Sequence, residues 1–490
     1  SSAASDVYKR QMYKILITAI GLIIWTSEAT IAFSEVIVKQ YETGGIYEGE
    51  FLNGKQHGQG KYRLPNGYTY EGSWIDGRIE GEGKAEYPDG AIYEGEFKSG
   101  QPSGSGSIVF PDGSTYAGEW LNGNFEGKGL IIYTNGISFE GYFKAGLQHG
   151  FGKMISPNGY SYEGNWENGE KEGVGKIVYT DNAVYEGNVK KGIRSGSGTL
   201  TMANGIIFKG DWKGGNINGK GNIIQPNGDS YEGELVEGRR NGKGTTLYAN
   251  GDSYSGYFED DKRSGQGTFL TENGYSYTGN WSEGKMEGKG KIVYPDGSIY
   301  EGSLKDDLQD GTGKITYPNG SAYEGQWVNG IIEGKGIAKY SNGLIYEGEF
   351  KDAKNHGFGV MKYEDGYTYS GEWANGVRDG YAKANYSDGT IYEGEFLAGR
   401  RSGQGRFVTE DGFIYEGEWF EGEIEGLGKA TYPNGNIYEG YFKKGKRQGT
   451  GVMTYSTGEK YEGYWANGKK ATEEELKAAE EAKGALGEGD

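Results

Sequence analysis

The residue types that most often carry out acid–base or metal chemistry are scarce in this chain. It has three histidines, His57, His149 and His356, and no cysteine, which excludes disulfides, thiol catalysis and cysteine-ligated metals. Each histidine occupies the same place in a repeating pattern, and many copies of the pattern separate them. We expect them to be too far apart to bind one metal ion or to form a catalytic pair, and we interpret them as solvated loop residues.

The repeating pattern is 23 residues long and predicts short β-strands. Each copy begins with an aromatic residue, from Tyr47 and Tyr70 onwards, and nineteen such starts follow one another without insertion to Tyr461. Glycine comes two residues later in all nineteen copies, and a second aromatic comes two residues after that in sixteen. Aromatic, glycine and aromatic at every second residue indicate one face of a strand.

The remainder of each copy predicts a second strand and two connections. The second half reads like "KAEYPDG", and its final Asn-Gly or Asp-Gly suits the positive φ angles of a tight type I′ hairpin turn. The other connection, "NGKQHGQG" in the first copy, is interpreted as a glycine-rich loop. We therefore expect each copy to form a hairpin, and the chain to form about 38 short antiparallel strands.

The pattern "YEGEWxNGxxxGxG" resembles the MORN (membrane occupation and recognition nexus) repeat, and the resemblance covers about residues 36–468. It implies an all-β fold, an elongated single-layer antiparallel β-meander of stacked hairpins. In such a rod each copy covers the aromatic face of the next. The repeat array is predicted over residues 47–468, after an N-terminal half-repeat strand at 33–46.

The N-terminal residues predict export. Residues 1–11 begin with Ser and are interpreted as a non-native leader. Residues 12–32 contain a lysine, an apolar run from Ile15 to Trp25 and a small-residue end, which is the layout of a cleaved signal peptide. Cleavage would leave 48 basic and 68 acidic residues, a net charge of −20, in the periplasm or outside the cell. The alternative is an uncleaved segment that anchors the chain in a membrane.

The C-terminal residues 469–490 depart from the pattern and predict a short capping helix and tail. Thr472 and Glu475 form the sequence of a capping box, and Gly484 is a typical helix end. Leu476 and Ala479 fall on one helix face, which we expect to cover the last strand of the sheet.

The second aromatic of each copy alternates between Phe and Trp, with one slip at Leu235 and Phe258, and predicts the core. Eleven residues further on, small residues follow Trp and larger residues follow Phe, so that Ala384 follows Trp373. We expect these two positions to face each other across the hairpin, which would conserve volume. All nine tryptophans outside the leader are then core residues: Trp74, Trp120, Trp166, Trp212, Trp281, Trp327, Trp373, Trp419 and Trp465.

Charged residues in the glycine-rich segments follow the same alternation. Copies with Trp carry acids there and copies with Phe more often carry bases, which predicts alternating charge along one sheet edge. At the slip two Phe-type copies are adjacent, which predicts a positive patch for an anionic partner unless Glu259, Asp260 and Asp261 neutralise it. The patch consists of Arg239, Arg240, Lys262 and Arg263.

The sequence does not predict an enzyme. No copy contains a catalytic constellation, and the chain has neither a phosphate-binding loop with lysine nor a nucleophile motif. No cofactor and no metal ion are expected. The formal net charge of −19 disfavours nucleic acid as a partner, because phosphate backbones are repelled.

The resemblance to MORN-repeat proteins implies a non-enzymatic scaffold or binding protein that acts in assembly, protein–protein interaction or self-association. Two alternatives stay open. The family is named for membrane association, and phosphoinositide binding has been attributed to it, although the acidic charge disfavours anionic lipids. Tyrosines and carboxylates along a groove are also compatible with a glycan-binding surface protein.

Overall fold

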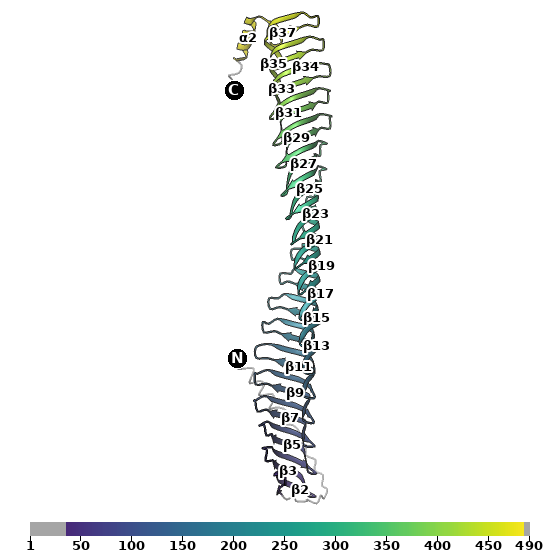
Figure 1. Ribbon diagram of the computed structural model, residues 1–490, viewed down its shortest axis with the longest axis vertical. Coiled ribbons are helices and arrows are strands. Elements are labelled where there is room, and N and C mark those ends of the chain that lie inside the picture. Colours follow the sequence, from purple (N-terminus) through teal and green to yellow (C-terminus); the bar gives the residue numbers. More distant parts are fainter. Residues whose placement is uncertain (1–35, 485–490) are drawn as a thin grey trace, which may run out of the picture. The chain divides into compact units, whose positions relative to one another are not determined.

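The computed structural model describes residues 36–484, so the predicted leader 1–11 and signal peptide 12–32 lie outside the described residues. The chain divides into two compact units, one ending at Lys171 and the other starting at Glu172. In both units short strands follow one another in chain order, and the helix α2 (Glu473–Gly484) ends the second unit (Figure 1). Within the described range, no helix is long and apolar enough to cross a membrane.

The strands alternate between seven and nine residues in nearly every repeat. Those of the first unit are β1 (Val36–Gln40), β2 (Ile46–Leu52), β3 (Lys55–Arg63), β4 (Thr69–Ile75), β5 (Arg78–Glu86), β6 (Ile92–Lys98), β7 (Gln101–Val109), β8 (Thr115–Leu121), β9 (Asn124–Ile132), β10 (Ser138–Lys144), β11 (Leu147–Ile155) and β12 (Ser161–Glu167).

The second unit contains the longer series, which begins with the strand that crosses the unit boundary. Its strands are β13 (Glu170–Val178), β14 (Val184–Lys190), β15 (Ile193–Thr201), β16 (Ile207–Lys213), β17 (Asn216–Ile224), β18 (Ser230–Val236), β19 (Arg239–Leu247), β20 (Ser253–Glu259), β21 (Lys262–Leu270), β22 (Ser276–Ser282), β23 (Lys285–Val293), β24 (Ile299–Lys305), β25 (Leu308–Thr316), β26 (Ala322–Val328), β27 (Ile331–Lys339), β28 (Ile345–Lys351), β29 (Lys354–Lys362), β30 (Thr368–Ala374), β31 (Val377–Asn385), β32 (Ile391–Leu397), β33 (Arg400–Val408), β34 (Ile414–Phe420), β35 (Glu423–Thr431), β36 (Ile437–Lys443), β37 (Lys446–Thr454), β38 (Lys460–Ala466) and β39 (Lys469–Ala471).

Within each unit the strands pair antiparallel with their neighbours in the chain, which confirms the predicted meander of hairpins. The first unit pairs in this way from β1 with β2 to β11 with β12. The second does so from β13 with β14 to β38 with β39. The short β39 extends the sheet beyond the predicted end of the array at residue 468, because Lys469 and Lys470 still pair with β38.

The tight turn and the longer connection of each repeat are the reverse of what was predicted. In the first repeat, Asn53 (φ 52°) and Gly54 (φ 77°) both have positive φ, so the type I′ turn lies between β2 and β3. The prediction of a glycine-rich loop there was wrong, because β3 runs straight through Gly58 and Gly60. The segment that was expected to form the I′ turn is a longer one, in which Gly67 is the residue with positive φ.

Paired glycines make room for the first aromatic residue of the hairpin in nearly every repeat. Positions are counted from that first aromatic, which is position 1. Gly49 at position 3 faces Gly60 at position 14, and the Tyr47 ring lies over both. The Tyr47 hydroxyl donates a hydrogen bond of 2.9 Å to the Glu50 carbonyl, which satisfies the polar end of a fully buried ring. A side chain on either glycine would occupy the space of the ring.

The aromatic face is a series of edge-to-face ring contacts that cross from one repeat to the next. All nine tryptophans of the described range are buried. The Trp74 ring lies 5.6 Å from Tyr70 in its own repeat and 5.1 Å from Tyr47 in the preceding repeat. This geometry is the favoured one for aromatic pairs, and it makes each repeat depend on its neighbour for a complete core.

The predicted facing of Trp373 and Ala384 was wrong. Ala384 pairs with Tyr369, and Trp373 pairs with Arg378, because a β-bulge after Gly371 shifts the register of the hairpin. The tryptophan packs instead against the second strand of the preceding repeat. The Trp419 ring, for example, lies 5.7 Å from Phe407. The alternation in side-chain size therefore reflects contacts between repeats.

The C-terminal helix begins with the predicted capping box. The Thr472 N–H donates to the Glu475 carboxylate at 2.8 Å, and the Glu475 N–H donates to the Thr472 hydroxyl at 3.2 Å. Leu476 is buried, and Tyr464 of β38 donates to Glu473 at the start of α2. The helix therefore packs at the end of the sheet, where a strand would otherwise have an exposed edge.

Candidate functional site

The four residues of the predicted positive patch are brought close together, but each has a local partner. The Arg239 guanidinium lies 3.2 Å from Asp260, and Lys262 pairs with Glu283. Arg240 lies 3.1 Å from Asp261 and also donates to its carbonyl oxygen at 2.7 Å. Arg263 lies over the Trp281 ring at 4.7 Å. Three of the four charges are thus neutralised within the chain.

The basic residues of the Phe-type repeats have two separate structural roles. Three of those at position 9, Arg239, Lys262 and Arg400, are exposed and pair with position 7 of the next repeat. The arginines at position 10 lie on the aromatic face, over the second aromatic residue of the next repeat, which is a tryptophan in most cases. The Arg447 guanidinium is 4.3 Å from the Trp465 ring centre and donates to the Gly468 carbonyl at 2.6 Å. These arginines cover the core.

The acidic residues at position 11 hold the type I′ turn of the next repeat. The Lys444 backbone N–H donates to the Glu425 carboxylate at 2.7 Å. The same contact is made by seven acids in repeats whose second aromatic is tryptophan: Glu80, Glu126, Glu172, Glu287, Glu333, Asp379 and Glu425. The predicted alternation of charge therefore has a structural cause, since these acids and bases bind the neighbouring repeat.

The three histidines share position 11 with these acids. They lie half-buried on β3, β11 and β29, so their interpretation as solvated loop residues was wrong. The Asn375 N–H donates to Nδ1 of His356 at 3.5 Å, which is the contact that the acids make. In the described part of the chain no three His, Asp or Glu side chains lie close enough together to hold a metal ion.

The opposite side of the sheet, here called the groove face, carries positions 2, 4, 13 and 15. An ion pair recurs on this face between position 15 of one repeat and position 2 of the next, such as Lys61 with Glu71 at 3.0 Å. Seven such pairs form within residues 36–484: Lys61–Glu71, Lys153–Glu163, Lys176–Glu186, Lys291–Glu301, Lys314–Glu324, Arg406–Glu416 and Lys429–Glu439. Where positions 15 and 2 form this ion pair, their charged groups are already neutralised and offer little to a ligand.

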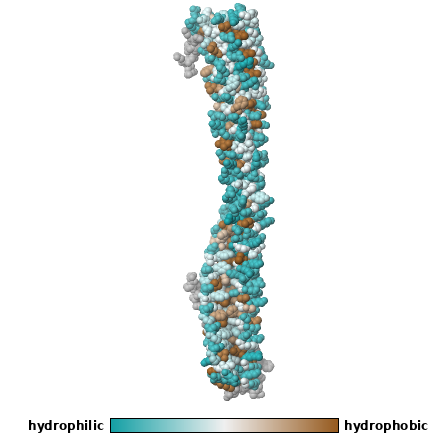
Figure 2. Space-filling view, viewed as in Figure 1, coloured by the Kyte–Doolittle hydropathy of each residue, from teal (hydrophilic) through white to brown (hydrophobic). Residues whose placement is uncertain are grey.

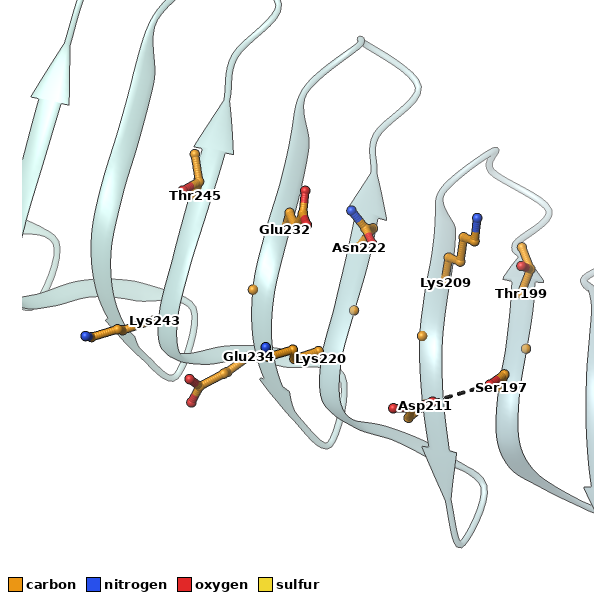
Figure 3. A pocket seen from close by; sticks show the side chains of 14 residues that line it. Ser197, Thr199, Lys209, Asp211, Lys220, Asn222, Glu232, Glu234, Lys243 and Thr245 are labelled. Atoms are coloured by element: carbon orange, nitrogen blue, oxygen red, sulfur yellow. Dashed lines mark hydrogen bonds between the residues drawn. The ribbon is translucent and has the colours of Figure 1, made fainter.

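The ion-pair series has several gaps, because position 15 is not basic in every repeat, and two of the gaps in the second unit coincide with grooves. The first, here called the polar groove, has a volume of about 970 Å³ and extends over β15–β19. Figure 3 shows two rows of side chains along it. One row contains Thr199, Lys209, Asn222, Glu232 and Thr245, and the other contains Ser197, Asp211, Lys220, Glu234 and Lys243.

The second groove, here called the apolar groove, has a volume of about 880 Å³ and extends over β23–β29. Ile337 and Val360 occupy position 15, where lysine forms the ion pair elsewhere, and Phe358 lies beside them. Phe358 is 57% exposed and Ile337 is 38% exposed. Glu347 has Ile337 opposite it on one side and Val360 on the other, so its carboxylate lacks the usual lysine neighbour.

Contiguous exposed apolar side chains on a polar sheet face make this groove a candidate contact surface. On the face seen in Figure 2, hydrophobic residues form small separate patches within a largely hydrophilic surface. Neither groove was among the predicted sites, because the predicted site residues lie beside the turns and not at positions 2, 4, 13 and 15. Replacement of the recurring lysine at position 15 was the available signal.

The solved structures that match this chain include distant likenesses. The TCP10 domain of Danio rerio CPAP is 14% identical, with a TM-score of 0.25, over 40% of this chain and 93% of that domain. The SAS-4 TCP domain of Drosophila melanogaster, solved with a proline-rich motif of Ana2, is 15% identical, with a TM-score of 0.21, over 41% and 90%. Virginiamycin B lyase from Staphylococcus aureus is 14% identical, with a TM-score of 0.11, over 63% and 100%. Such TM-scores carry no argument about this chain.

A search of curated proteins finds no match. Comparison with family models, in contrast, identifies the family. The model of the MORN repeat matches nineteen consecutive segments between residues 47 and 471, with the same period and order as the hairpins described above. Because these matches cover most of the chain, the protein belongs to the MORN-repeat family.

Proposed function

We propose that this protein is a non-enzymatic binding protein whose repeat array presents the apolar groove to a peptide segment of a partner. The observation that carries the proposal is the replacement of the ion-pair series by Ile337, Val360 and exposed Phe358 around Glu347. Removing these apolar side chains from water favours association. Glu347, which has Ile337 and Val360 as its cross-strand partners, can accept a hydrogen bond from a basic residue of the partner.

The chemistry of the apolar groove defines the partner further. Glu347 and Glu349 lie on β28, between the apolar residues of β27 and those of β29. Tyr381 of β31 is 55% exposed but lies outside this groove, because Glu372 of β30 is the cross-strand partner of Phe358 and separates the two rings. The fitting ligand is an extended peptide with apolar residues for the groove and one arginine or lysine opposite Glu347, since Glu349 has Lys335 as its cross-strand partner. A second copy of this acidic chain supplies less charge complementarity.

Selection from a random peptide display library on the purified chain tests the proposal. We expect enriched peptides to combine apolar and basic residues, and Phe358→Ser to weaken their binding roughly tenfold or more. Leu427→Ser is the matched control, because Leu427 occupies the same position 13 and is exposed, but the ion pairs Arg406–Glu416 and Lys429–Glu439 flank it. Equal loss in both variants, or no enriched peptide, would count against a peptide groove.

We also propose that the chain is exported, on the strength of the signal-peptide layout at residues 12–32. Protein isolated from the native host should begin near residues 30–33 and be found in the periplasm or outside the cell. An intact N-terminus that starts at Met12 in cytosolic protein contradicts the export proposal but leaves the peptide groove unaffected.

A further inference from the structure

The polar groove differs from the rest of the groove face in its unpaired charges. Three ammonium groups, on Lys209, Lys220 and Lys243, and three carboxylates, on Asp211, Glu232 and Glu234, line it. None of the six forms an ion pair with a described residue. Asp211 accepts one long hydrogen bond of 3.5 Å from the Ser197 hydroxyl. The groove therefore has hydrogen-bonding capacity that the chain leaves unused.

The reason for this capacity lies in the residues that replace the ion-pair series. Position 15 carries Thr199, Asn222 and Thr245 along this stretch, where lysine occurs in the paired repeats. Position 2 carries Lys209 in one repeat, where acid is the usual residue. Thr199 is therefore the cross-strand partner of Lys209, and Asn222 is that of Glu232, so neither charged group has an opposite charge across this strand pair. In the other row Lys220 is the cross-strand partner of Glu234, but the two side chains do not form an ion pair.

The mixture of groups limits the ligand class. An ammonium group only donates hydrogen bonds and a carboxylate only accepts them, and the two types are interleaved along the groove. A purely anionic ligand would meet three carboxylates, and a purely cationic ligand would meet three lysines. Apolar side chains, which anchor peptides and lipid tails, are absent from the lining of this groove. A ligand with many hydroxyl groups satisfies both types, since each hydroxyl donates and accepts.

Tyr257 supplies an apolar surface at one end of the groove. It follows Lys243 as its direct cross-strand partner on β20, and its ring is 42% exposed. The Lys243 ammonium lies 5.3 Å from the ring centre. An exposed ring beside polar groups can pack against the C–H face of a pyranose while neighbouring side chains bind its hydroxyls.

We infer that the polar groove binds a neutral oligosaccharide, with hydroxyl groups bridging the unpaired lysines and carboxylates and a sugar ring against Tyr257. Charge-assisted hydrogen bonds to both signs of charge would hold the sugar chain along successive strands. This site is separate from the apolar groove, which lies over β23–β29, and it does not depend on the proposed peptide function.

The test is titration of the full chain with neutral glucan, mannan and chitin-type hexasaccharides and with uronate and sulfated oligosaccharides of equal length. We expect one or more neutral sugars to bind. The double variant Asp211→Ala with Glu232→Ala should weaken that binding roughly tenfold, because both side chains are exposed and accept hydrogen bonds from hydroxyls. Tyr257→Ala should weaken it as well.

The matched control is Lys291→Ala with Glu301→Ala, which removes one ion pair of the groove face outside the polar groove. This control and Phe358→Ser should leave sugar binding unchanged, so failure of the sugar site can be told from failure of the peptide groove. Absence of binding to every neutral sugar, or binding confined to the acidic sugars, would overturn the inference. So would an equal loss in the groove variant and the control.

Discussion

At the residue scale, glycine at position 3 shows how one small residue permits the whole repeat. In the repeat that begins at Tyr277, a Cβ on Gly279 would lie 2.6 Å from the Gly290 Cα and 2.7 Å from the Lys289 carbonyl oxygen. These are backbone atoms of the paired strand, which cannot rotate away as a side chain can. Glycine is present at this position in all nineteen copies, and the contact supplies a physical reason.

Gly279→Ala is therefore expected to destabilise the second unit by about 1–3 kcal/mol, as overpacking of a close contact does. The measurement is the urea or thermal unfolding midpoint of the purified chain. Thr278→Ala, one residue away on the exposed groove face, is the control and should change stability by less than about 0.5 kcal/mol. If the two variants unfold alike, the close approach of the paired strands does not limit the residue type.

At the element scale, the hairpin is stabilised from outside itself. The type I′ turn of one repeat is held by an acid at position 11 of the preceding repeat, and the tryptophan of one repeat is covered by an arginine at position 10 of the preceding repeat. Stacking thus combines aromatic burial with hydrogen bonds to backbone groups that a single hairpin would leave to solvent.

Glu425→Ala tests this contact between elements. It removes the acceptor for the Lys444 N–H and should lower the free energy of unfolding by about 1–2 kcal/mol, a typical value for a hydrogen bond to a charged group. Glu425→Gln keeps an acceptor oxygen and should recover part of the loss. Hydrogen exchange of the Lys444 amide gives a local readout. Unchanged protection of that amide in the alanine variant would show that the carboxylate does not hold the turn.

At the scale of the whole molecule, the buried tyrosines at position 1 are expected to lower the free energy of unfolding at alkaline pH. Burial raises the pKa of Tyr47, Tyr254 and Tyr346 to about 12, from an ordinary value of 10.0. A raised phenol pKa means that the folded state favours the protonated form. Its contribution to stability is complete below the unfolded pKa of about 10 and is lost as pH rises through the folded value.

The expected outcome is a urea midpoint that the phenols leave unchanged up to about pH 9 and that falls between about pH 10 and pH 12. Tyr254→Phe should make the fall shallower, because it removes one titrating group, although it also removes the hydrogen bond to the Tyr257 carbonyl. A midpoint that stays constant to pH 12 would contradict this assignment of the buried phenols.

The sequence by itself determined the period of the hairpins, the identity of the buried face and the helix cap at Thr472. These follow from local rules: alternation of side chains along a strand and the hydrogen bonds of a capping box. It also identified the residues of the patch around Arg240, but their net charge depended on Asp261, which lies 21 positions away in the chain and 3.1 Å away in space.

Only the tertiary structure decided the partners of Trp373, the place of the type I′ turn and the positions of the two grooves. A bulge after Gly371 shifts the register, and no local pattern predicts on which strand such an extra residue falls. The grooves arise because positions 15 and 2 of successive repeats become neighbours across strands, where Ile337 or Thr199 replaces the recurring lysine. The sequence shows where the recurring lysine is replaced, but the strand pairing decides which residue then loses its partner.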